Sequence, residues 1–194
     1  NLKYRISIVT GGPGTGKTTC LRAIMDVYHK VWPSEHILLM APTGLAAKRM
    51  AESTGMNSAT IHKACGLVPA DNPSGFKAQG ECRICGFVGI DEMSMVGEHL
   101  FAFAVDAVLN SPSTRIVLLG DTDQLAPVSR GDVLRDLIEC GVIKTVRLDV
   151  NYRQGSTSTI TDASIKIREN RAYSGMTRNL RFDDEFNFIS VTDP

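Results

Sequence analysis

Short, mainly apolar runs recur along the chain and alternate with segments in which apolar residues are three or four positions apart. The runs lie at residues 4–10, 37–40, 87–90, 115–119 and 142–148. Runs of this length are typical of strands that are buried on both faces of a parallel sheet.

The segments between these runs predict helices that each pack one apolar face on the sheet. The residues of these faces are Leu21, Ile24, Met25 and Tyr28; Ala46, Ala47 and Met50; Leu100, Phe101, Ala104, Val105 and Val108; Val133, Leu134, Leu137 and Ile138; and Ile160, Ala163, Ser164 and Ile167. The alternation predicts one α/β domain, with a mostly parallel sheet and helices on both faces.

The first predicted strand and helix are joined by residues 11–18, which fit the phosphate-binding P-loop pattern G-x-x-x-x-G-K-[ST]. Glycines allow backbone N–H groups to approach phosphate oxygens, and the positive end of the helix dipole attracts them. Lys17 would contact the β- and γ-phosphates, and the Thr18 hydroxyl would bind Mg²⁺. The predicted ATP-binding residues are Gly12, Pro13, Gly14, Thr15, Gly16, Lys17, Thr18 and Thr19.

Two more predicted strands end in polar residues at the edge of the sheet where ligands bind. Asp91 and Glu92 follow the run at 87–90, and Gln124 comes shortly after the run at 115–119. Asp91 would hold Mg²⁺ through water and Glu92 would deprotonate the attacking water, although acidic strand ends also occur without a function. Gln124 could contact either the γ-phosphate or the attacking water.

Further polar residues have less specific patterns around them. Thr43 follows Pro42 and is expected to cap a helix. His62 alone is typical of a surface or core histidine, and Arg153 alone is typical of a surface or ion-paired arginine. A guanidinium at Arg153 could also reach a γ-phosphate.

Residues 66–81 combine three glycines and two prolines, which predicts a loop or a small protruding hairpin. The Cys82-Arg83-Ile84-Cys85 segment that follows could be half of a zinc site, but the chain offers no second pair. We therefore interpret both cysteines as packing residues.

Composition narrows the class of protein only slightly. The 21 basic and 21 acidic side chains balance, so any nucleic-acid surface must be local. No apolar run has the length of a membrane span, so we expect no membrane partner. The odd number of cysteines, five, suggests the reducing environment of the cytoplasm. Because the chain begins at Asn1 and ends on a strand-like segment, we expect it to be part of a longer protein.

Six segments in order resemble the first motor domain of superfamily 1 helicases, and most closely the RecD-like branch. They are Gly-Gly-Pro-Gly-Thr-Gly-Lys-Thr, Ala-Pro-Thr-Gly-x-Ala-Ala, Thr-Ile-His, Asp-Glu-x-Ser-Met, Gly-Asp-x-x-Gln-Leu-x-Pro-Val and Asn-Tyr-Arg-Gln. The resemblance covers nearly the whole chain and implies a RecA-like P-loop NTPase fold across residues 1–194. It also implies ATP hydrolysis, with Mg²⁺, coupled to five-prime to three-prime movement on single-stranded DNA.

The resemblance assigns roles to individual positions. Lys17, Thr18, Asp91, Glu92 and Gln124 would form the catalytic ATP site, with Arg153 as a γ-phosphate arginine. Pro42, Thr43, Thr60, His62, Pro127 and Val128 would contact the DNA strand. Residues 66–81 stand where relatives carry a strand-separating pin, with Phe76 as a candidate wedge.

The sequence also departs from the family pattern. The residues before the P-loop do not include the glutamine-bearing motif that reads adenine, and we expect the second RecA-like domain of the motor to lie elsewhere in the longer protein. Nuclease or relaxase partners are further expectations. Two other functions stay open: another P-loop enzyme such as a small-molecule kinase, and a nucleotide-dependent regulatory subunit of a nuclease complex.

Overall fold

The computed structural model describes residues 2–72, 74–79, 85–109 and 113–150. The chain divides into two compact units, and the first of them extends to Asp149. The predicted helix face at 160–167, the final strand-like segment and Arg153 lie outside the described residues.

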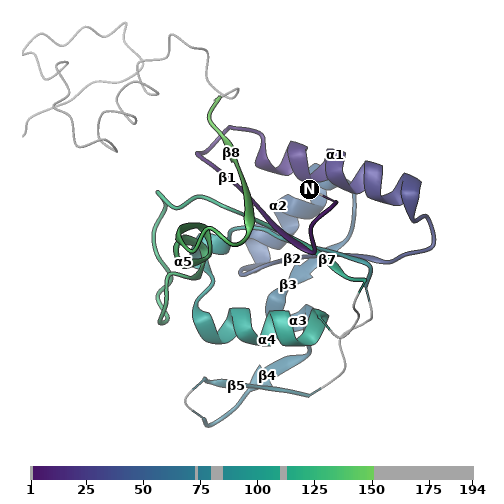
Figure 1. Ribbon diagram of the computed structural model, residues 1–194. Coiled ribbons are helices and arrows are strands. Elements are labelled where there is room, and N and C mark those ends of the chain that lie inside the picture. The colour runs from purple at the N-terminus through teal and green to yellow at the C-terminus, as the bar shows by residue number, and fades with distance from the viewer. Residues whose placement is uncertain (1, 73, 80–84, 110–112, 151–194) are drawn as a thin grey trace, which may run out of the picture. The chain divides into compact units, whose positions relative to one another are not determined.

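Six strands of the first unit form one sheet in the order β3-β2-β6-β7-β1-β8 (Figure 1). Every neighbouring pair in this sheet is parallel, as the apolar runs predict. The strands are β1 (Ile6–Gly11), β2 (Ile37–Ala41), β3 (Ser58–Thr60), β6 (Phe87–Ile90), β7 (Arg115–Gly120) and β8 (Lys144–Leu148).

Helices cover both faces of the sheet, which confirms the predicted layering (Figure 1). On one face, Leu21 and Met50 of two helices pack with Val9 and Leu119 of the strands. On the other face, Ile8 belongs to the core that includes α3, α4 and α5. The helices are α1 (Lys17–Val31) and α2 (Gly44–Thr54) on the first face, and α3 (Ile61–Ala64), α4 (Glu98–Val108) and α5 (Val133–Glu139) on the second, with a 3₁₀ turn η1 (Met93–Met95).

Two predicted strands start later than their apolar runs suggest. The run at 4–10 becomes β1 from Ile6, because its neighbour β7 begins at Arg115 and the first pair is Ile6 with Ile116. The run at 142–148 becomes β8 from Lys144, which pairs with Ser7. Strand limits are therefore set by the neighbouring strand as much as by local hydrophobicity.

A two-stranded antiparallel sheet projects beyond α4 (Figure 1). Its strands are β4 (Leu67–Pro69) and β5 (Phe76–Ala78), and Pro69 pairs with Phe76. The segment expected to form a loop or a protruding hairpin is thus a hairpin over the residues that the structure describes.

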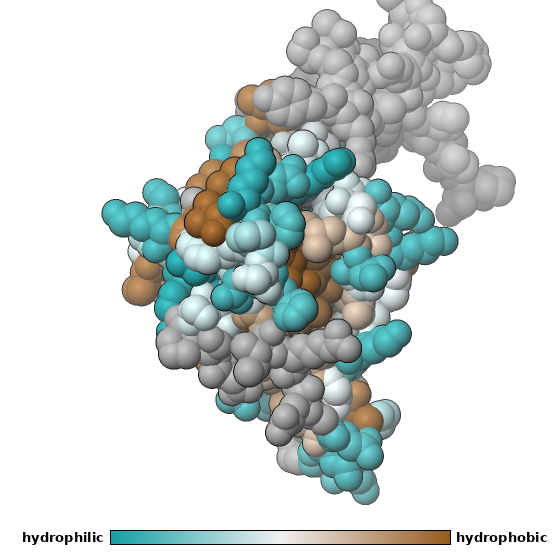
Figure 2. Space-filling view, turned by 90° about the vertical axis from the view of Figure 1, so that its right-hand side faces the viewer, coloured by the Kyte–Doolittle hydropathy of each residue, from teal (hydrophilic) through white to brown (hydrophobic). Residues whose placement is uncertain are grey.

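The surface of the described residues mixes apolar and polar side chains. On the face shown in Figure 2, hydrophobic residues lie in small groups among hydrophilic ones. The large apolar side chains that are exposed come from several parts of the chain, among them Val31 of α1, Leu45 of α2 and Val128 of the loop after β7. None of the described helices is long and apolar enough to cross a membrane.

Candidate nucleotide-binding site

The strand order brings three of the predicted polar segments together. β6, β7 and β1 are consecutive in the sheet and end at Ile90, Gly120 and Gly11. Thr10 pairs with Gly120 and Ile90 pairs with Leu118, so the three strands end at nearly the same level. The P-loop, the Asp91-Glu92 pair and the turn that carries Gln124 therefore lie at one edge of the sheet, as predicted.

The P-loop runs from the end of β1 into the first turn of α1. Gly16 precedes the helix with φ of 85°, a left-handed conformation that disfavours other residues. No side chain caps the N-terminus of α1, and its first turn contains no acidic residue. Its backbone N–H groups are thus available to an anion, which the helix dipole also favours.

Lys17 reaches back across the loop. Its Nζ donates to the carbonyl oxygens of Gly11 at 2.6 Å and Gly12 at 3.1 Å. The Thr15 hydroxyl also donates to the Gly12 carbonyl, at 2.9 Å. The loop thereby holds an ammonium group in place, and the phosphates of a nucleotide would compete with these carbonyl oxygens for it.

The P-loop also packs closely on the strand at the edge of the sheet. A Cβ atom on Gly11 would lie 2.5 Å from the Leu148 carbonyl oxygen and 2.8 Å from Thr15 Oγ1. Gly11 and Leu148 are paired residues of β1 and β8. The chain therefore leaves β8 directly beside the P-loop, and Arg153 comes soon afterwards in the sequence.

Asp91 is half-buried, and its environment contains opposing influences. Burial raises the pKa of the Asp91 carboxyl, and the charge of Glu92 raises it further. The hydrogen bond from the Glu92 N–H and the charge of Lys17 lower this pKa. The Lys17 ammonium is therefore close enough to the Asp91 carboxyl for its charge to affect the pKa of that group.

Glu92 adopts an unusual backbone conformation. Its φ of 53° is the only positive φ among the described residues other than glycine. Its N–H donates to Asp91 Oδ1 at 2.8 Å, and its carbonyl oxygen accepts from the Met95 N–H at 3.0 Å. Such strain is often found at functional sites, where surrounding contacts hold it.

The turn after β7 is organised by Asp121, which is buried. Its carboxylate accepts from the backbone N–H of Asp123 at 3.1 Å and from Gln124 Nε2 at 3.4 Å. The sequence pattern led to Gln124 and not to Asp121. The sequence does contain a pattern that could have identified Asp121, because this residue directly follows a buried strand, as Asp91 does.

Oxygen donors at this edge suit a hard divalent cation such as Mg²⁺. The half-buried Thr18 lies in the first turn of α1, and Asp91 supplies a carboxylate. No group of three or more His, Cys, Asp or Glu residues in the described part could hold a metal ion unaided. Cys85 is buried in the core, as expected of a packing residue, and Cys82 lies outside the described residues.

Five of the six predicted DNA-contacting residues fall into two groups. Pro42 and Thr43 follow β2, and Thr60 ends β3 opposite Ala41, so these three residues lie at the same sheet edge as the P-loop. Pro127 and Val128 lie in the loop after Gln124, where Val128 is fully exposed.

Both threonines cap helices. The N–H of Ala46 donates to Thr43 Oγ1 and that of Lys63 donates to Thr60 Oγ1, each at 3.2 Å. The cap at Thr43 confirms the sequence prediction.

His62 makes a contact that the sequence did not predict. Its ring lies edge-on against Phe76 of the hairpin, with ring centroids 4.5 Å apart. Phe76 also packs against the main core and stands at the start of β5. The candidate wedge residue thus starts β5 in the strand pair beside the hairpin turn, and its ring contacts α3 through His62.

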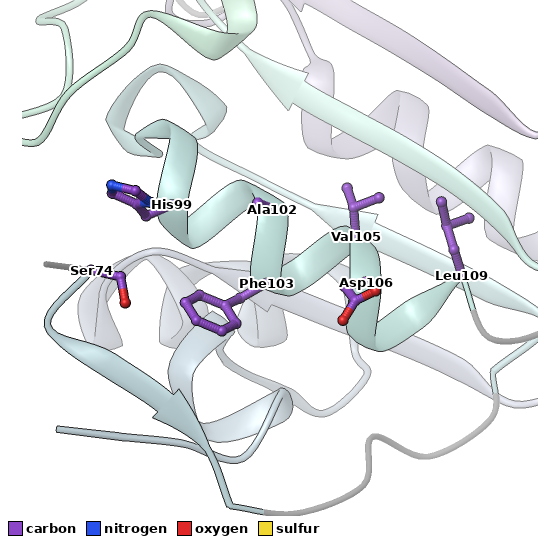
Figure 3. Close-up of a pocket in the computed structure, with 7 residues that line it drawn as sticks. All are labelled: Ser74, His99, Ala102, Phe103, Val105, Asp106 and Leu109. Carbon is purple, nitrogen blue, oxygen red and sulfur yellow. The ribbon is translucent and has the colours of Figure 1, made fainter. Parts of the chain in front are cut away.

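A pocket lies along α4, and it is distinct from the nucleotide-binding residues. Among the described residues it is lined by Ser74 of the hairpin and by His99, Ala102, Phe103, Val105, Asp106 and Leu109 of the helix and its C-terminal end (Figure 3). None of these belongs to the predicted ATP site. The pocket is therefore a feature of the junction between α4 and the hairpin.

A parallel sheet with a P-loop after its first strand, and carboxylate and amide side chains on the neighbouring strand ends, defines a P-loop nucleotide-binding domain. Comparison with known proteins agrees with this class. The sequence matches a family described as "AAA domain" over residues 2–192. The chain belongs to this AAA domain family, and within it to the RecD-like motor domains of superfamily 1 helicases.

Two curated relatives illustrate the similarity. The ATP-dependent RecD2 DNA helicase of Deinococcus radiodurans is 36% identical over 162 residues, which cover 83% of this chain and 21% of the relative. The RecBCD enzyme subunit RecD of Mycolicibacterium smegmatis is 35% identical over 179 residues, covering 80% of this chain and 32% of the relative. The chain thus spans about a fifth to a third of the length of these proteins.

Solved helicase structures share the fold. A Pif1 helicase from Bacteroides in complex with ADP-AlF3 and single-stranded DNA superposes with a TM-score of 0.59 at 19% identity. The alignment covers 90% of this chain and 44% of that protein. Pif1 helicase from Candida albicans gives the same TM-score at 25% identity, over 84% of this chain and 40% of that protein.

Proposed function

We propose that this chain is the ATP-hydrolysing motor domain of a longer DNA helicase that moves five-prime to three-prime on single-stranded DNA. The observation that carries the proposal is the gathering of Lys17, Asp91, Glu92 and Gln124 at one edge of the sheet. The names of the curated relatives, a DNA helicase and a RecBCD enzyme subunit, support DNA as the substrate.

The residues of the site have complementary roles in this proposal. The α1 N-terminus and Lys17 bind the phosphates, and Thr18 and Asp91 hold Mg²⁺, which supplies charge neutralisation when bound. Glu92 accepts a proton from the attacking water.

The proposal also assigns roles to residues other than Lys17, Thr18, Asp91, Glu92 and Gln124. Arg153, in the Asn-Tyr-Arg-Gln segment that resembles the family motif, contacts the γ-phosphate. Pro42, Thr43, Thr60, His62, Pro127 and Val128 contact the DNA backbone without reading its sequence. A second RecA-like domain of the same protein completes the ATP site and the DNA track.

The experiment is an ATPase assay of the full-length protein with and without single-stranded DNA. Lys17→Ala removes the phosphate-binding ammonium, and we expect it to abolish productive ATP binding and hydrolysis. Lys48→Ala is the matched control, because Lys48 is exposed on α2 in an ion pair with Glu52 and its loss should have little effect.

Hydrolysis that is unaffected by DNA, or that survives Lys17→Ala, would contradict the proposal. Duplexes with a five-prime or a three-prime single-stranded tail then test direction, and only the five-prime tail should support unwinding.

A second candidate is a nucleotide-dependent subunit of a nuclease complex, which the names of the RecBCD relatives favour. Nuclease or relaxase subunits would be the partners. Co-purification with a nuclease, together with loss of complex activity on Lys17→Ala, would support this assignment. It is compatible with an active motor.

A further inference from the structure

The turn between β7 and the exposed loop at 125–131 is built around one carboxylate. Asp121 is 3% exposed, and its two oxygens accept from different donors. Oδ1 accepts from the Asp123 backbone N–H at 3.1 Å, and Oδ2 accepts from Gln124 Nε2 at 3.4 Å. The Asp121 carbonyl oxygen also accepts from the Gln124 backbone N–H, at 3.2 Å.

The other side of the turn is held by α5. Arg135 donates from its guanidinium to the Thr122 carbonyl oxygen at 3.2 Å and to Asp132 at 2.8 Å. The turn is therefore fixed from the sheet and from a helix, while the Gln124 side chain itself is exposed to solvent.

The Asp121 carboxylate, as an acceptor, decides which way the Gln124 amide faces. A carboxylate can only accept hydrogen bonds, so the amide must turn its Nε2 end toward Asp121. Oε1 is then the acceptor that the amide offers to a ligand, and Nε2 keeps one further N–H. An oxygen acceptor repels the oxygens of a phosphate and accepts a hydrogen bond from water.

We propose that Asp121 is a positioning residue that orients the Gln124 amide so that its oxygen accepts a hydrogen bond from the attacking water. This inference rests on the proposed ATPase function and deepens it, because the sequence alone left Gln124 open as a ligand of the phosphate or of the water. Glu92 and Gln124 then share the task of aligning one water for in-line attack.

The test is Asp121→Asn, which preserves the size of the side chain. The substituted side chain keeps one oxygen that can accept from the Asp123 N–H, while its amide group faces Gln124 and donates to Oε1. Gln124 would then present Nε2 to the ligand. In the full-length protein we expect the turnover number to fall about 10-fold or more, as for other small misalignments of reacting groups. We expect the dissociation constants of ADP and of a non-hydrolysable ATP analogue, and the melting temperature, to stay near wild type.

A double-mutant cycle separates positioning from other roles. If Asp121 acts through Gln124, the turnover of Gln124→Ala is not lowered further by adding Asp121→Asn. Asp123→Asn is the matched control, because it removes a carboxylate from the same turn without changing the acceptor of Gln124 Nε2.

Each outcome has a defined meaning. Weaker analogue binding with unchanged turnover, or additive losses in the cycle, would overturn the role of Asp121 while leaving the ATPase function intact. Absence of any hydrolysis by the wild-type protein would overturn the proposed function and this inference together. An Asp121→Asn protein that melts much earlier than wild type, with losses that add in the cycle, would show a structural role instead.

Discussion

Glu92 combines a candidate catalytic carboxylate with a backbone that most residues avoid. A glutamate at φ of 53° costs free energy relative to its ordinary conformations, on the order of 1 kcal/mol. The hydrogen bonds to Asp91 Oδ1 and from the Met95 N–H hold it there. The hydrogen bonds therefore fix the main chain from which the Glu92 side chain extends.

Glu92→Gln tests the assignment of the general base. The amide keeps the size of the side chain but cannot accept a proton, so we expect nucleotide binding to be retained. Hydrolysis should fall by on the order of 10²–10⁴-fold. Steady-state ATPase assays and titration with a fluorescent ATP analogue measure the two quantities, and normal turnover by Glu92→Gln would refute the assignment.

The raised pKa of Asp91 predicts a pH dependence of stability. Because the folded state holds the proton more tightly than the unfolded state, ionising Asp91 costs stability as the pH rises above the carboxyl's ordinary pKa. The stability that protonated Asp91 contributes is fully present below that ordinary pKa and is lost as the pH rises through the raised pKa. Asp91→Asn removes the ionisation and keeps an oxygen that can accept from the Glu92 N–H.

We therefore expect Asp91→Asn to melt at a higher temperature than wild type at neutral pH, without nucleotide or Mg²⁺. The difference should shrink as the pH approaches 3.8, the ordinary pKa of this group. Thermal unfolding followed by circular dichroism across this range measures it. A variant that is less stable than wild type at neutral pH would show that the charged carboxylate is favoured by its surroundings.

At the scale of elements, the N-terminus of α2 depends on one hydroxyl. Thr43 Oγ1 accepts from the Ala46 N–H, and loss of such a cap typically costs about 1 kcal/mol. We expect Thr43→Ala to lower the melting temperature by roughly 2–4 °C, and Thr43→Ser to restore most of it. Equal melting temperatures for wild type and Thr43→Ala would contradict the capping role. Only a DNA-binding defect shared by both variants would point to a direct contact by the threonine methyl group.

The contact between His62 and Phe76 joins α3 to the hairpin. Aromatic pairs of this geometry contribute about 0.5–1.5 kcal/mol beyond the area that they bury. If the hairpin separates DNA strands, His62 supports it by holding Phe76, at the start of β5, against α3. If His62 contacts DNA, its ring nitrogens serve the strand directly.

Two substitutions distinguish these roles. His62→Phe preserves a ring against Phe76 and removes the nitrogens, whereas His62→Ala removes both. For an anchoring role we expect His62→Ala to lose unwinding while retaining most DNA-stimulated ATPase activity, and His62→Phe to keep both. Equal defects in the two variants would support the DNA contact.

The elements that could be predicted from the sequence are those whose pattern is local. The apolar runs located the central strands, Thr43 marked the start of α2, and the P-loop pattern located the phosphate site. The pairing of β1 with β7 and β8, which sets where two strands begin, depends on residues that are far apart in the sequence, such as Ile6 and Ile116. The burial of Asp121 and the ring contact of His62 likewise arise only when distant segments meet.

At the scale of the whole molecule, the candidate nucleotide-binding edge of the described unit lies next to an exposed apolar loop. The nucleotide edge brings together the P-loop, the acidic pair and the amide turn, and the loop that follows Gln124 exposes the apolar side chains of Leu125 and Val128. Ordinary monomeric surfaces expose single apolar residues without consequence. If the turn at Gln124 contacts the nucleotide as proposed, these two side chains suit a surface whose contacts change with nucleotide state.

The proposed need for a second RecA-like domain leads to an expectation for the 194 residues by themselves. A motor needs two bodies that approach and separate with each ATP, because closing and opening between them moves the strand. We expect the isolated chain to bind nucleotide weakly and to unwind a tailed duplex little or not at all, whereas the full-length protein unwinds it. A fluorescence-based unwinding assay of both proteins at equal concentration measures this, with Lys17→Ala of the full-length protein as the inactive control. Robust unwinding by the isolated chain would mean that one RecA-like unit generates directed movement alone, and the proposed need for a second domain would be wrong.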